Sequence, residues 1–570
     1  MSKIKENIKK VPIAAYVAAI ISICLAFSVM LAGIITAING KDTTTTDLTV
    51  APTYNQLYST IKKLSNSHEN LLNGETTGSV SDGASSTTNN QVAGVDEADF
   101  VKNDGKHIYI LSGGSVQIFE SNNGKPKLIC ALPVLEENEF ANSIFVAENR
   151  LVVLAQINSN TQIKVYNTTD KSAPVLIQSV SQSGYINTAR LVDDTLFLLT
   201  NHLVYKANMA KTKPETFVPC VGGAPVAEQD ISIIGSTQIP SYLVVSATNI
   251  TTAKLTASES VLGGAENVYA TKENLYYTFT KYTQSQNNSY VNNTVIVKMA
   301  LGKEDITILA DTVIEGVPLN QFSLDEHNGN LRIVTTSQKN LVFEGLLDSV
   351  SSSDTVQTNN LFVLDKNLNK IGEITNLAQD ERVYSVRFSG DIGYFVTFRQ
   401  VDPLFAVDLS NPEKPKILST LKIPGFSEYL HEYGSDYLFG FGKSATDTGL
   451  VTGIKLSMFN VSDPANVTEQ QTLNIEGAWS EVSENHKAIM VDSNQNIIAF
   501  SVSDTYARTK VYVYGFTEKR GFFEKAELTL PTVEQSTRFL WIDKYFYVAT
   551  DTGLYAYSLE LFAPTATITF

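Results

Sequence analysis

The sequence is poor in the residues that build covalent or metal-linked sites. Its 570 residues include three cysteines and six histidines. It contains no CxxC pair and no HExxH or HxxxH pair, which excludes the common zinc-ligand spacings. The Gly-x-Ser-x-Gly pattern of many serine hydrolases is also missing. A catalytic triad, if one exists, must be assembled from distant segments.

The few cysteines leave one structural question open. Cys24 lies in an apolar segment, whereas Cys130 and Cys220 stand alone in the rest of the chain. In an exported protein the last two could form a disulfide. Their positions place them in different structural units, which favours two free thiols, because a disulfide needs Cα atoms within about 7 Å.

The sequence also has no cluster of positively charged residues after its first ten positions. The formal net charge is -16, and no run of Lys and Arg occurs beyond the first ten residues. Binding to a phosphate backbone requires such clusters. We therefore expect no nucleic-acid partner.

One long hydrophobic run is present, over residues 11–38, and it carries no charged side chain. About 20 such residues span a bilayer. Four lysines precede the run, so the positive-inside rule predicts a single-pass anchor with a cytoplasmic tip (residues 1–10) and an extracellular body. Cleavage near residue 40 is the alternative. A lipoprotein is excluded because Ile23 precedes Cys24 where a small residue is required.

Residues 39–91 read as an extracytoplasmic linker. Residues 41–52 are rich in Thr, and residues 73–91 are rich in Gly, Ser, Thr and Asn, a composition typical of flexible spacers. Between them, apolar residues recur every three or four positions, and Thr53 with Gln56 fits a capping box. We predict a short helix over residues 53–72 that packs on the outer domain or on a partner.

From residue 92 to residue 570 the pattern is all-β and repetitive. Residues 383–423 are the clearest unit and predict four consecutive strands. Repeated four-stranded units of about 40–50 residues are typical of β-propeller blades. We count nine units, with eight as the fallback count, and the third unit is stretched by an insertion near residues 207–230. Two stacked β-sandwiches are the alternative fold.

Short polar turns recur at matching places in several units. Asn167, Asp408 and Asn460 each follow an apolar strand and precede Ser or Thr two positions later. Asn and Asp side chains at such positions bind backbone amides and start a turn. We expect these three residues to begin hairpins between the third and fourth strands.

Four stretches resemble a known family of secreted or membrane-tethered prokaryotic proteins. They are "NNQVAGVDEADFVKNDGKHIYIL" from Asn89, "ERVYSVRFSGDIGYFVTFRQVDPLFAVDLSNPEKPKILSTLKIPGFSEYLH" from Glu381, "GIKLSMFNVSDP" from Gly453 and "WSEVSENHKAIMVD" from Trp479. Members of that family carry a C-terminal β-propeller distantly related to WD40 repeats. The resemblance implies an extracytoplasmic propeller and supplies no reaction.

Acidic residues crowd the start of the β-rich region. Asp96, Glu97, Asp99 and Asp104 could supply oxygen ligands to Ca²⁺. Their spacing differs from that of an EF-hand. The structural interpretation is that Asp104 and Gly105 form a hairpin turn while the other acids accept hydrogen bonds from loop amides. We favour this interpretation and keep the Ca²⁺ site as the alternative.

Two further motifs concern ligands. Gly442, Lys443 and Ser444 end like a P-loop, but Tyr437 occupies the position of the first glycine and a strand follows, so we reject nucleotide binding. Candidate ligand-binding residues near predicted loops are Arg399, Asp402, Tyr429 and Trp479. For Arg399 and Asp402 we favour a structural salt bridge, and for Tyr429 and Trp479 a place in the core is the alternative.

These observations favour a membrane-anchored, non-catalytic binding or scaffold module. The expected partners are surface or cell-wall proteins, peptides or glycans. An extracytoplasmic hydrolase or lyase with its site at the axial channel is the first alternative, and Ca²⁺-dependent adhesion is the second. We expect no cofactor other than Ca²⁺ in this last case.

Overall fold

The computed structural model describes residues 48–68, 89–235, 237–284, 290–343, 352–398, 402–446, 450–503 and 508–570. The predicted membrane segment, residues 11–38, lies outside these ranges. Within them, no helix combines the length and apolar character needed to cross a bilayer. The anchor therefore stays a prediction.

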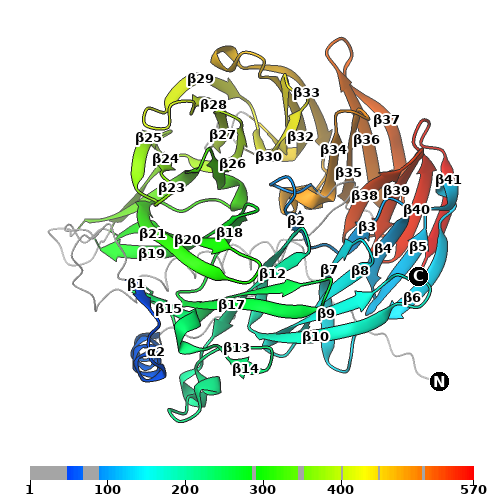
Figure 1. Cartoon of the computed structure of the whole chain (residues 1–570). Coiled ribbons are helices and arrows are strands. Elements are labelled where there is room, and N and C mark those ends of the chain that lie inside the picture. Colours follow the sequence, from blue (N-terminus) through cyan, green and yellow to red (C-terminus); the bar gives the residue numbers. More distant parts are fainter. Residues whose placement is uncertain are drawn as a thin grey trace, which may run out of the picture.

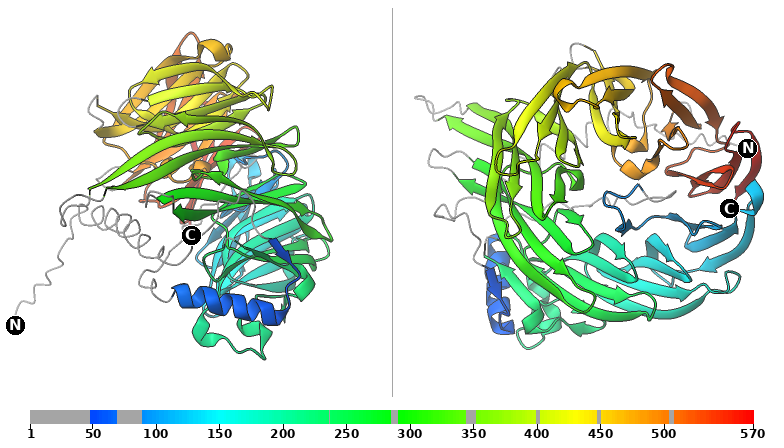
Figure 2. Two further views of the ribbon diagram at one scale, coloured as in Figure 1. Left: turned by 90° about the vertical axis from the view of Figure 1, so that its left-hand side faces the viewer. Right: turned by 45° about the horizontal axis from the view of Figure 1, so that its top comes forward.

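The described strands form a ring of twisted sheets, shown in Figure 1 and from two further directions in Figure 2. Five sheets hold four consecutive antiparallel strands each. Their strands are β3 (Val101–Asn103), β4 (His107–Ser112), β5 (Ser115–Glu120), β6 (Lys127–Pro133); β26 (Arg382–Ser389), β27 (Ile392–Phe398), β28 (Asp402–Asp408), β29 (Lys416–Ile423); β30 (Phe426–Tyr433), β31 (Tyr437–Ala445), β32 (Val451–Asn460), β33 (Thr468–Glu476); β34 (Ile489–Asp492), β35 (Ile497–Ser503), β36 (Thr509–Thr517), β37 (Gly521–Thr529); and β38 (Thr537–Ile542), β39 (Tyr545–Thr550), β40 (Gly553–Ser558), β41 (Pro564–Thr569).

Two sheets are extended by additional strands. The six-stranded sheet holds β7 (Glu139–Ala147), β8 (Arg150–Ile157), β9 (Asn160–Asn167), β10 (Val175–Ser183), β13 (Cys220–Val221) and β14 (Ala224–Pro225). The seven-stranded sheet holds β11 (Tyr185–Val192), β12 (Thr195–Leu203), β16 (Ser241–Asn249) and β17 (Lys254–Leu262), with β2 (Asp96–Glu97) on one edge and β15 (Ile231–Ile234) and β1 (Leu48–Val50) on the other. The predicted insertion supplies β13 and β14, and β15, which follows it, pairs with β17 in parallel.

The remaining sheet has eight strands. It joins β18 (Asn267–Ala270), β19 (Asn274–Gln284), β20 (Tyr290–Leu301) and β21 (Ile306–Glu315) to β22 (Leu324–His327), β23 (Asn330–Phe343), β24 (Ser352–Leu364) and β25 (Lys370–Leu377). The two halves meet through a short β20–β23 pairing at Tyr290 and Val291. The described strands thus form eight sheets, and the count of nine blades requires this sheet to be divided in two.

The predicted helix is observed as α2 (Tyr54–His68), and the capping box forms. The backbone N–H of Thr53 donates to Oε1 of Gln56 at 2.8 Å, and the amide of Gln56 donates to the hydroxyl of Thr53. Leu57 and Ile61 are fully buried against the insertion, where they join Phe217. The segment around α2 is therefore packed on the β-body and is more than a spacer.

Local chemistry explains the repeated hairpins. The carboxamides of Asn167 and Asn460 and the carboxylate of Asp408 accept hydrogen bonds from backbone amides two residues later, at 2.9, 3.1 and 2.9 Å. This confirms the predicted turns. Gly442 lies inside β31, where a Cβ atom would sit 1.8 Å from the carbonyl oxygen of Phe426. Position 442 is therefore a glycine because the neighbouring strand leaves no room for a side chain, and not because the residue binds phosphate.

The ring closes through side chains between its last and first sheets. Ile110 and Phe119 of the first sheet share a core cluster with Leu540 and Tyr547 of the last. The Tyr547 hydroxyl donates to the carbonyl oxygen of Ser121 at 3.2 Å. Cys130 and Cys220 are free thiols, so no disulfide contributes within the part of the chain that the structure describes.

Candidate functional site

A polar cluster lies at the inner ends of the blades, around the segment that leads into the ring. This segment, residues 89–103, makes backbone contacts with two sheets. β2 pairs with β11, where Glu97 lies opposite Arg190, and Asp99 forms an isolated bridge with Ile144 of β7. We call the polar residues gathered along this segment the axial cluster.

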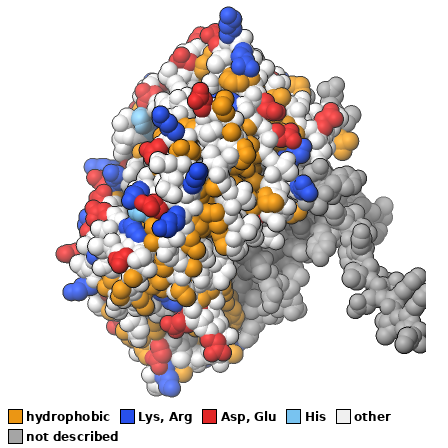
Figure 3. All heavy atoms as spheres, turned by 90° about the vertical axis from the view of Figure 1, so that its right-hand side faces the viewer, with side chains coloured by type: hydrophobic (Ala, Val, Ile, Leu, Met, Phe, Trp, Pro, Cys, Tyr) orange, Lys and Arg blue, Asp and Glu red, His pale blue; other side chains and the backbone are white. Residues whose placement is uncertain are grey.

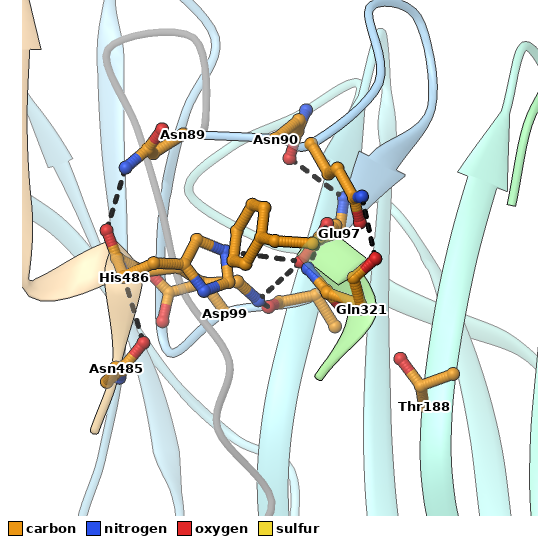
Figure 4. A network of polar contacts seen from close by, with 12 residues as sticks. Asn89, Asn90, Glu97, Asp99, Thr188, Gln321, Asn485 and His486 are labelled. Carbon is orange, nitrogen blue, oxygen red and sulfur yellow. Dashed lines mark hydrogen bonds and ion pairs between the residues drawn. The ribbon is translucent and has the colours of Figure 1, made fainter. Parts of the chain in front are cut away.

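Glu97 is the most densely contacted carboxylate of the axial cluster. It is 3% exposed. Its Oε2 lies 3.1 Å from Nζ of Lys487, and its Oε1 lies 3.7 Å from Nη2 of Arg190. Gln321 donates to Oε1 at 3.3 Å, and Nε2 of His486 lies 3.7 Å from Oε2. Figure 4 shows Glu97 between Gln321 and His486. Gln321 lies in the connection from β21 to β22, and His486 lies in the connection from β33 to β34, which we call the β33–β34 crossing.

Asp99 holds a second buried ion pair. Its Oδ2 lies 3.3 Å from Nε of Arg538, and its Oδ1 accepts the backbone N–H of Phe100 at 2.6 Å. Arg538 also donates to Oε1 of Glu481 at 3.1 Å, and Asn485 donates to the same oxygen at 2.8 Å. These contacts tie the entering segment to β38 and to the crossing between β33 and β34.

The other two acids have local partners. Asp96 accepts two hydrogen bonds from Nζ of Lys102, at 2.9 and 3.0 Å. Asp104 accepts the backbone N–H of His107 at 2.7 Å and the hydroxyl of Tyr109 at 2.9 Å. Asp104 thus shapes the hairpin into β4, as the structural interpretation expects.

Burial and neighbouring charges together determine the protonation of the acids and of His486 in the axial cluster. Burial opposes ionisation of Glu97, but the charges of Arg190 and Lys487 outweigh it and hold the pKa of this carboxyl well below its ordinary value. Burial raises the pKa of Asp99 to about 7, although Arg538 and Lys487 act against the rise. Burial, with the cations around it, lowers the pKa of His486 to about 3. His486 is therefore neutral at pH 7.

A neutral hydrogen-bond chain adjoins the charged part. Nδ2 of Asn89 donates to the Tyr429 hydroxyl at 2.8 Å and to the carbonyl oxygen of His486 at 2.7 Å. The Tyr429 hydroxyl lies 2.7 Å from Nδ1 of His431. Burial and the neighbouring Arg387 lower the pKa of His431 to about 3. Arg387 is partly exposed, and no carboxylate of the described residues pairs with it.

The structure separates the residues proposed for ligand binding. Tyr429 is buried in the axial cluster at 5% exposure, whereas Trp479 is 45% exposed on the β33–β34 crossing. Arg399 lies outside the described residues, and Asp402 is placed only as the first residue of β28. Because antiparallel strands alternate in direction, the β27–β28 connection and the β33–β34 crossing leave their sheets at the same face of the ring.

No group of three or more His, Cys, Asp or Glu side chains within the described ranges converges as metal ligands would. The predicted Ca²⁺ site at Asp96, Glu97, Asp99 and Asp104 stays a prediction. In the structure each of these carboxylates has a partner in the protein.

Sequence reasoning missed the cationic partners, Arg190, Lys487 and Arg538. One signal was present. Three of the stretches that carry the family resemblance meet at the axis. The first supplies Asn89 to Asp99, the second supplies Tyr429 and His431, and the fourth supplies Glu481 to Lys487. Arg190, Gln321 and Arg538 lie outside these stretches and carried no local signal.

The fold and its axial cluster define an all-β propeller with a polar segment inserted at its centre. The family pattern described as "Beta propeller domain" matches residues 85–561. The chain therefore belongs to the Beta propeller domain family.

Two archaeal proteins are similar to this chain over most of its length. An uncharacterised protein of Archaeoglobus fulgidus is 29% identical over 548 residues, with 81% of each chain covered. An uncharacterised protein of Methanocaldococcus jannaschii is 26% identical over 484 residues, covering 72% of this chain and 73% of its own. Neither relative brings an activity to the comparison.

Among solved structures the similarity is weaker. Sqt1 of Saccharomyces cerevisiae gives a TM-score of 0.37 at 9% identity, covering 74% of this chain and 93% of its own. A periplasmic gluconolactonase of Pseudomonas aeruginosa gives 0.32 at 8% identity, with coverages of 57% and 92%. Scores at this level bear on neither substrate nor partner.

Proposed function

We propose that this chain is a membrane-anchored, extracytoplasmic propeller that binds surface or cell-wall proteins, peptides or glycans and performs no chemistry. Its body consists of nine blades, of which two share the eight-stranded sheet. The anchor and the orientation rest on the apolar run at residues 11–38 and on the lysines before it.

One observation carries the non-catalytic part of the proposal. The acids at the axis, where a propeller enzyme would place its catalytic groups, are occupied by ion pairs with cations of the same chain. Lys487 and Arg538 are 3% and 2% exposed. A general acid or base must reach the substrate, and buried, ion-paired carboxylates do not.

The exposed face supplies better candidates for contact. Trp479 is half exposed. Arg387 is only partly exposed, lies near Tyr429 and His431, and has no carboxylate partner among the described residues. An exposed aromatic and an unpaired guanidinium suit a peptide or glycan that carries carboxylates. Leu128 lies away from these two residues, on the edge strand β6, and is 46% exposed. Figure 3 shows a separate band of hydrophobic side chains on the side of the ring where β6 and β41 lie.

An array of wall peptides and acidic glycans tests the binding function. The full-length chain should bind a carboxylate-bearing member, and Trp479→Ala and Arg387→Met should each weaken that binding about tenfold. Leu128→Ala, on the outer edge, is the matched control and should bind normally. Turnover of any array member by the wild-type chain would favour the hydrolase or lyase instead.

Protease treatment of intact cells tests the topology separately. An epitope after Phe570 should be removed, while an epitope before Met1 should be protected. The opposite result would show that the orientation is wrong.

A further inference from the structure

A second group of carboxylates lies away from the axis, and it has no cations. A cavity of about 370 Å³ opens between the outer edge of the seven-stranded sheet and the turn before β21. Strands β1, β15 and β17 form one wall, where Val50 lies opposite Ser232. Residues 304–308 form the other wall.

The lining is rich in oxygen and has no basic group. Asp230, Glu259, Glu304 and Asp305 line the cavity together with several Ser and Thr hydroxyls, and none of the described lining residues is Lys, Arg or His. The nearby Lys303 pairs with Asp194 at 2.7 Å instead. A buried or clustered carboxylate is normally matched by a cation of the protein.

Glu259 is the unusual member of this group. It is 8% exposed, so the protein covers more than nine-tenths of it. Its Oε1 accepts one weak hydrogen bond, from the Ser232 hydroxyl at 3.2 Å. Glu259 lines the cavity, and no described residue donates a hydrogen bond to its Oε2. A carboxyl group with one weak donor can accept a further hydrogen bond or a cation.

The groups facing Glu259 keep it protonated. Burial, reinforced by Asp230 and Asp305, raises the pKa of Glu259 to about 8. Burial and Asp305 also raise the pKa of Asp230. On the inner side, Tyr277 is fully buried, and its pKa is raised well above the ordinary value, so it stays neutral. No described group near Glu259 supplies positive charge.

The size and lining of the cavity indicate which kind of cation it could bind. The carboxylates do not converge as three ligands on one metal ion. The volume is that of roughly a dozen water molecules, which suits an organic cation. Ala257, Ile306 and Ile308 add an apolar wall that methylene groups can contact.

We propose that this cavity binds an aliphatic polyamine, with one ammonium group on Glu259 inside and another on Asp230 and Asp305 at the mouth. The proposal does not depend on the partner-binding function proposed above. Binding ionises Glu259, so the carboxyl proton passes to solvent and the ammonium group replaces it as the partner of the carboxylate.

Calorimetry on the full-length chain with spermidine tests this proposal. At pH 8 spermidine should bind, with release of a fraction of one proton in buffers of different ionisation enthalpy, and 1,8-octanediol should not. Glu259→Gln preserves the side-chain shape and should weaken binding at least about tenfold. Asp305→Asn lies at the exposed mouth and should weaken it a few-fold.

Glu137→Gln is the matched control, because Glu137 is exposed and far from this lining. It should bind spermidine like the wild type. The proposal fails if the wild type does not bind, if Glu259→Gln and Asp305→Asn both bind normally, or if Glu137→Gln loses as much affinity as Glu259→Gln.

Discussion

Two regions of this molecule bury carboxyl groups in opposite ways. In the axial cluster, Glu97 and Asp99 are 3% and 0% exposed, and each lies against a buried cation. In the outer cavity, Glu259 is 8% exposed and has only a hydroxyl partner. In the axial cluster, ion pairs hold residues 89–103 against the blades. In the outer cavity, the carboxyl group of Glu259 has no cation of the described residues beside it and can bind one from solution.

The two arrangements respond differently to pH. The folded state lowers the pKa of Glu97, so its contribution is present above the ordinary pKa of a glutamate and is lost as the pH falls. Glu259 has a raised pKa of about 8, so the folded state holds its proton more tightly. Glu259 therefore lowers the free energy of unfolding progressively as the pH rises from about 4.5 to about 8.

Removing a cation from the axial cluster should have the largest effect. Lys487→Met leaves Glu97 buried without its nearest counter-charge, which should lower the free energy of unfolding by about 3–5 kcal/mol. Urea denaturation at pH 7 measures this. Lys510→Met is the control, because its pair with Glu527 is exposed and should be worth at most about 1 kcal/mol. Equal effects from the two variants would remove the distinction.

Neutralising two acids of the entering segment should cost less. Asp96→Asn with Asp99→Asn keeps both side-chain shapes, and Arg538 retains Glu481. Because burial raises the pKa of Asp99 to about 7, its charge adds little stability at pH 7, so we expect a loss of at most about 2 kcal/mol. The melting temperature should not respond to Ca²⁺ in either protein. A rise with Ca²⁺ in the wild type that disappears in the double variant would establish a cation site, since a ligand of the folded state stabilises it.

Neutralising Glu259 should instead stabilise the protein. At pH 9 the wild type must hold an ionised Glu259 without a cation, so Glu259→Gln should raise the free energy of unfolding by about 2 kcal/mol. At pH 5 the gain should be much smaller, because the carboxyl is neutral in the folded state and the pH is only just above its ordinary pKa of 4.5 in the unfolded state. Urea denaturation at both pH values tests the sign. A gain that does not change with pH would argue against a protonated Glu259.

The smallest effect should come from the neutral chain at the axis. Tyr429→Phe removes one hydroxyl that contacts Asn89 and His431, which should cost about 1 kcal/mol. Thermal unfolding at pH 7 measures it. A loss as large as that of Lys487→Met would mean that the hydroxyl, and not the charges, holds the segment.

The blades were predictable because their determinants are local. Strand alternation and turn residues such as Asn167 and Asp408 lie within a few positions of the hydrogen bonds that they make. The axial ion pairs were not predictable in this way. Glu97 meets Arg190 and Lys487, which are separated from it by long stretches of chain, and no spacing rule joins residues from different blades.

The sequence contains a pattern from which the burial of Glu259 could have been predicted. In β17, Ala257 and Val261 share one face of the strand with Glu259, so the acid interrupts an alternating apolar row. The docking of α2 onto the insertion was harder to foresee. Its apolar periodicity predicts a buried face, but the surface that covers it, around Phe217, lies more than 150 residues away.

A double-mutant cycle between Glu97 and Lys487 tests most directly whether charge pairing fastens the entering segment. Glu97→Gln, Lys487→Met and the combined variant should be compared by urea denaturation at pH 7. We expect a coupling energy of about 2–3 kcal/mol, with the combined variant more stable than the sum of the single losses predicts. Strictly additive losses would contradict the account, because they would show that the two buried charges do not stabilise each other.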